Sequence, residues 1–61
     1  MPTLTSIARK IIATYAPDRD ATYDDLNRMI DDYRDELTDD ELTLANHYPD
    51  ELLDAIIQSI P

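Results

Sequence analysis

The chain has 61 residues, neither cysteine nor glycine, and a formal net charge of −9. A chain of this length makes one domain, residues 1–61, with a small core, and without cysteine it has no disulfide and no thiolate metal site. The negative charge argues against direct binding to nucleic-acid phosphates or anionic membranes, which both favour basic surfaces.

The acidic residues are unevenly distributed. Residues 1–16 carry only Arg9 and Lys10, whereas residues 17–61 carry all fourteen Asp and Glu against three arginines, a net charge of −11. Such a surface favours a basic protein or a cation as partner, and adaptation of a whole proteome to salt is the alternative that needs no partner. The early cations also interrupt any signal-peptide pattern, and no apolar run reaches the ~20 residues of a membrane span, so we expect a soluble cytoplasmic protein.

The first predicted helix covers about residues 4–15. Its apolar residues recur at helical spacing, Thr3 or Thr5 can cap its N-terminus, and Pro17 disfavours helical backbone at Ala16. Because the chain has no glycine, we expect no turn that needs a positive φ angle.

The second predicted helix covers about residues 23–37, with Thr22 as its N-cap. At 100° per residue its apolar side chains gather on one face. The opposite face surrounds Arg28 with carboxylates: Asp24, Asp25, Asp31, Asp32 and Asp35. Arg28 is four residues from both Asp24 and Asp32, so it can relieve part of their repulsion.

Two further short helices complete the chain. Thr38 and Glu41 have the spacing of a capping box, which predicts a third helix over about residues 39–47. Pro49 suits the start of a fourth over about residues 50–59, whose apolar residues occupy more than half of its circumference. So wide a stripe predicts contact with several helices or with a second copy of the chain. We therefore expect an all-α, compact bundle of four short helices, with Ile11, Ile30 and Ile56 in a core built by the first, second and fourth.

The four tyrosines are the only aromatic residues. Tyr15, Tyr23 and Tyr33 lie on apolar stripes, so we expect them in the core with their hydroxyls at its rim. The alternative is that one or two of them anchor an interface.

The sequence does not indicate an enzyme, a cofactor or a metal site. His47 is the only histidine, and the two serines lie near opposite ends of the chain. An EF-hand loop needs oxygen ligands at its third position and glycine at its sixth, but a loop starting at Asp31 has Tyr33 and Glu36 there. We expect a protein that acts by binding.

The acidic face of the second helix is the candidate partner-binding site. Five acids between Asp24 and Asp35 lie along about 16 Å of helix, roughly one charge per 3.3 Å, close to the ~3.4 Å per charge of one DNA strand. The expected contact has its centre and its extension at these residues: Asp24, Asp31, Asp32, Asp35, Asp39, Asp40 and Glu41.

In size and charge the chain resembles small phage-encoded inhibitors that mimic DNA. That likeness implies a viral inhibitor that blocks a basic, nucleic-acid-binding protein, and it assigns no role to any single residue. The alternative function is a structural or adaptor protein that uses apolar helix surfaces for docking or for forming a homodimer.

Overall fold

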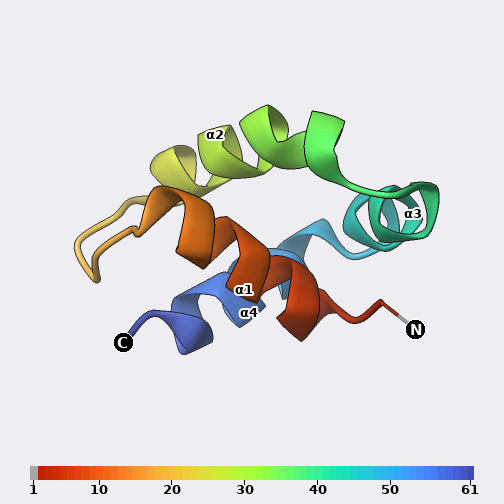
Figure 1. Ribbon diagram of the computed structural model, residues 1–61. Helices are drawn as coiled ribbons and strands as arrows, with labels where there is room; N and C mark the ends of the chain where they lie inside the picture. Colours follow the sequence, from red (N-terminus) through yellow and green to blue (C-terminus); the bar gives the residue numbers. More distant parts are fainter. Residues whose placement is uncertain (1) are drawn as a thin grey trace.

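The structure, a computed structural model, describes residues 2–61, which form four α-helices and no β-strand (Figure 1). The helices are α1 (Leu4–Tyr15), α2 (Tyr23–Tyr33), α3 (Asp39–His47) and α4 (Pro49–Ser59), and the 3-10 helix η1 (Arg34–Glu36) follows α2 directly. The predicted all-α bundle of four short helices is confirmed. No helix among the described residues has both the length and the apolar character that a membrane span requires.

Three of the helices begin with a capping box. Thr3, Thr22 and Thr38 each accept a hydrogen bond from the backbone N–H three residues later, at 3.1, 3.1 and 3.3 Å. The side chain of that later residue accepts a hydrogen bond from the threonine's own N–H in return. Each box satisfies two backbone donors that a helix start would otherwise leave unpaired, so the sequence sets these three starts locally. The fourth helix begins instead with Pro49, whose missing N–H costs nothing at that position.

The end of α1 departs from expectation. Ala16 has φ 48° and ψ 53°, so a positive φ occurs although the chain has no glycine. Pro17 disfavours the right-handed helical conformation at Ala16, and the left-handed one lets the Ala16 N–H donate to the carbonyl oxygen of Ile12 at 2.7 Å. The hydrogen bond closes the helix, at a conformational cost of about 1–2 kcal/mol for a residue with a Cβ.

The second helix is shorter than the sequence predicted. Regular α-helix stops at Tyr33, and the chain tightens into η1, where the Leu37 N–H donates to the Arg34 carbonyl oxygen at 3.2 Å. Leu37 is then extended, with φ −82° and ψ 145°. This geometry buries the Leu37 side chain in the core and leaves Thr38 extended as the N-cap of α3.

One hydrophobic core holds the bundle together. The helices α1 and α4 pack most extensively against each other, α2 lies across them, and α3 contacts both (Figure 1). Buried side chains form a continuous cluster: Ile7, Ala8, Ile11, Leu26, Ile30, Leu37, Ala45, Leu52 and Ile56. The expected burial of Ile11, Ile30 and Ile56 is confirmed, and Ala45 of α3 extends the core beyond the three expected helices. The wide apolar stripe of α4 is explained by its contacts with all three other helices.

The tyrosines are less buried than the sequence predicted. Tyr23 is 62% exposed, Tyr15 36% and Tyr48 48%, while Tyr33 is half-buried. Tyr23 is the first residue of α2, one turn before Leu26, the first fully buried side chain of that helix. A place on the apolar stripe therefore does not bury a residue that lies at the very end of the packed segment. The rings of Tyr15 and Tyr33 instead meet edge to face, with centroids 6.2 Å apart.

Candidate functional site

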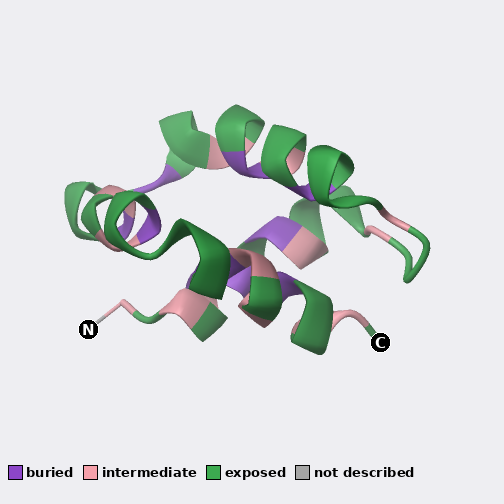
Figure 2. Ribbon diagram, turned by 180° about the vertical axis from the view of Figure 1, so that it is seen from behind, coloured by how far each residue is buried: buried purple, intermediate pink, exposed green. Residues whose placement is uncertain are grey.

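Nearly all carboxylates of the protein are exposed. Thirteen of the fourteen Asp and Glu residues are exposed, and only Glu41 is buried. Figure 2 shows the outer side of α2 exposed along its length, with the buried residues on the side facing the other helices. We use the name acidic face for the exposed aspartates of α2, η1 and the start of α3, apart from Asp25, which caps the start of α2: Asp24, Asp31, Asp32, Asp35, Asp39 and Asp40.

The geometry of α2 explains why its aspartates point to solvent. Leu26 and Ile30 are the buried residues of α2, and at 100° per residue Asp24, Asp31 and Asp32 lie well away from them. Asp35 follows within η1, where the rise is about 2.0 Å per residue instead of 1.5 Å. The stretch from Asp24 to Asp35 is therefore about 17 Å long, and its charge spacing stays near that of a nucleic-acid strand.

Few cations neutralise the acidic face. Within residues 2–61 only Asp31 of this face is in an ion pair, with its Oδ1 3.3 Å from the Nε of Arg34. Both side chains are largely exposed, so this contact is weak and opens easily to a partner. Arg28 has no carboxylate within ion-pair distance in the described chain, although Asp24 and Asp32 lie four residues away on either side. Residues 24–40 carry eight acids against two arginines, which leaves a local charge of −6.

Glu41 does not belong to the acidic face, which corrects the sequence-based expectation for this residue. It is 3% exposed, its Oε2 accepts a hydrogen bond from Lys10 Nζ at 2.7 Å, and its Oε1 accepts one from the Thr38 N–H at 3.0 Å. Because α1 carries Lys10 to the start of α3, both carboxylate oxygens already accept a hydrogen bond within the protein. The pair ties these two helices together, and its burial keeps Glu41 out of reach of a partner.

Folding shifts the titration of this ion pair in opposite directions. The hydrogen bond from Lys10, followed by that from Thr38, lowers the pKa of Glu41 below its ordinary value of 4.5. The same hydrogen bond raises the pKa of Lys10 above 10.5. Glu41 therefore adds stability above its unfolded pKa and loses it as the pH falls through the folded one. Lys10 adds stability below its unfolded pKa and loses it as the pH rises through the folded one, so the pair is fully effective at neutral pH.

Asp39 and Asp40 continue the acidic face into the first turn of α3. Both are exposed, and neither is in an ion pair within the described chain. Their negative charges at a helix N-terminus also stabilise α3 through its dipole, so acidic residues at these positions are explained without any partner. Asp31 and Asp32 are different, because neither lies in the first turn of a helix.

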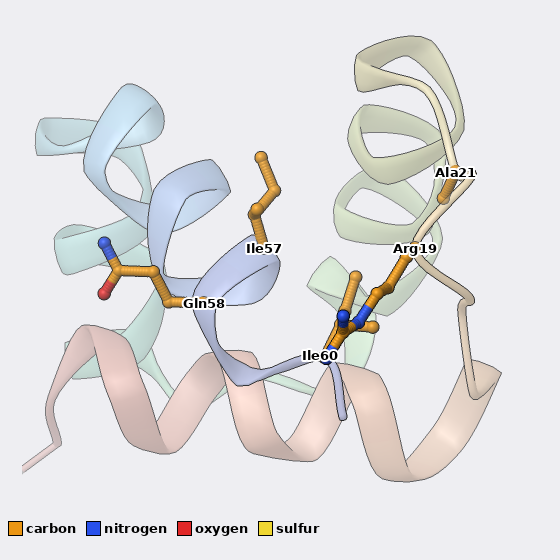
Figure 3. Close-up of a pocket in the computed structure, with 5 residues that line it drawn as sticks. All are labelled: Arg19, Ala21, Ile57, Gln58 and Ile60. Atoms are coloured by element: carbon orange, nitrogen blue, oxygen red, sulfur yellow. The ribbon is translucent and has the colours of Figure 1, made fainter.

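A second surface feature is a hollow near the C-terminal end of α4, lined by three apolar and two polar residues (Figure 3). It has a volume of 330 Å³ and is lined by Arg19, Ala21, Ile57, Gln58 and Ile60. Figure 3 shows Arg19 reaching from the turn after α1 to lie beside Ile60, while Ile57 points away from α4. The Nε of Arg19 donates to the Pro61 carbonyl oxygen at 3.1 Å, and Ile57 remains 41% exposed.

Sequence reasoning missed the roles of Lys10 and Arg19. Lys10 is 31 residues from Glu41, and Arg19 is 42 residues from Pro61. No local pattern connects residues so far apart, and the capping-box spacing explained Glu41 without a second partner. Among residues 2–61, no three His, Asp or Glu side chains are grouped so that they could hold a metal ion.

Comparison with known proteins found no relative. No protein-family model, curated protein or solved structure matches this chain.

Proposed function

We propose that this protein is a non-enzymatic binding module that blocks the nucleic-acid-binding surface of a basic cytoplasmic protein, as small phage-encoded DNA mimics do. The acidic face supplies the contact, with carboxylates standing where the phosphates of a nucleic acid would lie. The observation that carries this proposal is the row of exposed aspartates on α2 and η1, of which Asp31 alone is in an ion pair within the described chain.

The energetic cost of the acidic face supports a role in binding. Like charges close together on a helix destabilise it, and a net charge of −9 on 7.0 kDa opposes a compact state. A 61-residue domain has little stability to lose. A basic partner would relieve this repulsion on binding, and the long-range field would accelerate the encounter.

The central test neutralises the acidic face without changing its shape. The variant with Asp31→Asn, Asp32→Asn and Asp35→Asn keeps the fold, because these side chains are exposed and their repulsion is removed. A partner is first captured from an extract of the source organism at low salt, and its association is then followed by surface plasmon resonance. We expect the association rate of the variant to fall about tenfold or more, with a smaller change in dissociation.

A matched control changes the net charge equally at another place. Asp18→Asn, Asp20→Asn and Glu51→Gln also remove three exposed negative charges, but none of these residues belongs to the acidic face. This variant should associate nearly as fast as the wild type. Duplex DNA should displace the wild-type protein from its partner. Equal losses in the two variants, or a complex that forms unchanged on DNA-bound partner, would refute the decoy function.

A second candidate function is supported by the exposed apolar side chains in the hollow near the C-terminal end of α4. Ile57, 41% exposed, stands beside Ile60 and Ala21, so a helix of another protein or a second copy of this chain could cover it. Such contacts hold or strengthen as salt rises, whereas those of a decoy weaken. Analytical ultracentrifugation of the wild type and of Ile57→Ser at 50 mM and 500 mM NaCl separates the two: an adaptor self-associates more at high salt, and Ile57→Ser abolishes it.

A further inference from the structure

A separate hollow lies between the first residue of α2 and the first half of α4. It has a volume of 310 Å³ and is lined by Tyr23, Asp50, Leu53 and Asp54. None of these four residues was part of the candidate site predicted from the sequence. Three of them come from a single helix, and Tyr23 closes the hollow from α2, so its shape depends on how these two helices pack.

The lining of the hollow includes one aromatic and one aliphatic side chain, those of Tyr23 and Leu53. Tyr23 is 62% exposed and is in neither of the two aromatic pairs of the described chain, which join Tyr15 to Tyr33 and His47 to Tyr48. Its ring therefore has a face free for a ligand. Leu53 is half-buried against the core, so it presents part of its side chain to the hollow.

Two carboxylates complete the lining. Asp50 and Asp54 are four residues apart on α4, which places their Cβ atoms about 5–6 Å from each other. Both are exposed, and within the described chain neither is in an ion pair or accepts a side-chain hydrogen bond. Asp50 lies in the first turn, where it also stabilises the helix dipole, but Asp54 lies beyond that turn and has no such role. No ion pair within the described chain therefore compensates the charge of these two carboxylates.

We propose that this hollow binds the side chain of an arginine. A planar guanidinium can stack on the Tyr23 ring while its N–H groups donate to the Asp50 and Asp54 carboxylates, and its aliphatic stem can lie along Leu53. A lysine ammonium offers neither the flat face nor the spread of donors. The inference rests on the proposed function for the source of the arginine, which is the basic partner that the acidic face attracts.

The arginine site would make the complex longer-lived and fix its orientation, which the acidic face alone does not. Exposed charge pairs accelerate association but hold a complex weakly, whereas an anchored arginine slows dissociation and fixes orientation. Tyr23 is next to Asp24 in the chain, so a partner lying on the N-terminal end of the acidic face can reach the hollow.

The test uses a small probe, so it does not depend on knowing the partner. Uniformly ¹⁵N-labelled protein is titrated with N-acetyl-arginine amide, with the lysine analogue and with the neutral citrulline analogue, all at one ionic strength. We expect saturable shifts of the Tyr23, Leu53 and Asp54 amides with the arginine probe, weaker binding of the lysine probe and no saturable binding of the citrulline probe.

Two variants locate the binding. Tyr23→Leu keeps an apolar side chain but removes the aromatic face, so the affinity for the arginine probe should fall about two- to fivefold. Asp54→Asn should weaken binding as well, while its circular dichroism spectrum stays that of the wild type. Shifts spread evenly over all exposed acids, equal binding of arginine and lysine probes, or unchanged affinity in Tyr23→Leu would overturn the site.

The same titration separates this inference from the proposed function. The variant with Asp31→Asn, Asp32→Asn and Asp35→Asn should bind the arginine probe like the wild type, because its three changes lie outside the hollow. Suppose that this variant keeps probe binding, and that the wild type captures no partner from which duplex DNA displaces it. The decoy function then fails, and the arginine site stands. If the triple variant loses probe binding, the probe was bound by the acidic face and the arginine site fails.

Discussion

Adjacent isoleucines on α4 provide the sharpest test of the packing. Ile56 is 0% exposed and Ile57 is 41% exposed, although the two residues are neighbours of the same type in the same helix. Replacing each with alanine changes helix propensity, volume and composition equally. The difference between the two variants therefore isolates the contribution of burial.

The expected magnitudes differ widely. Ile56→Ala removes three buried carbon groups at about 0.8 kcal/mol each and leaves a cavity, so we expect a loss of about 2–5 kcal/mol in the free energy of unfolding. Ile57→Ala should cost less than about 1 kcal/mol, since much of its surface already meets water. A domain of this size has roughly 3–9 kcal/mol in total, so Ile56→Ala removes a large share of it.

Thermal and urea unfolding, followed by circular dichroism at 222 nm, measure both variants. One kcal/mol shifts the midpoint of a domain this small by about 4–8 °C, so Ile56→Ala should melt roughly 10 °C or more below the wild type. Ile57→Ala should stay within a few degrees. Midpoints that agree between the two variants would show that α4 does not present Ile56 to the core, and the arrangement of the bundle would be wrong.

Three further predictions concern charge and backbone. Raising NaCl from about 10 to about 200 mM shortens the Debye length from about 30 Å to about 7 Å, so it should raise the thermal midpoint by weakening repulsion among the carboxylates. A falling midpoint would mean that attractive pairs dominate. In a ¹³C NMR titration, the pKa of the Glu41 carboxyl should lie below 4.5 and should rise in the variant Lys10→Met. That variant should be less stable than the wild type at neutral pH, and the difference should shrink as acid protonates Glu41. An unchanged Glu41 titration in that variant would remove the ion pair as the cause. Ala16→Gly should stabilise the protein by up to about 1 kcal/mol, because glycine adopts the positive φ without strain. Ala13→Gly, at an exposed position inside α1, should destabilise it by about 1 kcal/mol. A loss of stability in both variants would contradict the left-handed conformation at the end of α1.

Only some of the candidate site could be predicted from sequence. Helical periodicity correctly placed Asp24, Asp31 and Asp32 on the solvent side of α2, because residues opposite a buried stripe face water. It gave no hint of the hollow around Tyr23, since that hollow requires α2 and α4 to meet in a particular way. Arg28 also remained unpaired in the described chain, because spacing permits a contact on an exposed helix but does not enforce it.

The sequence by itself determined the local features of this protein. The capping boxes at Thr3, Thr22 and Thr38 act within four residues, and so does Pro17, so helix starts and the end of α1 follow from neighbours along the chain. The isoleucine and leucine stripes determined which faces turn inward, because burying them is the main gain in free energy available to so short a chain.

Tertiary structure alone decided what depends on distant partners. Glu41 is acidic and lies in a first helical turn like Asp39 and Asp40, but Lys10 meets its carboxylate from α1 and makes it part of the interior. Tyr23 shares a stripe with Leu26, but the packed part of α2 begins only after it. The periodicity of the sequence indicates which side of a helix is apolar. Which residues are covered, and which charges find a partner, follows only from where the other helices lie.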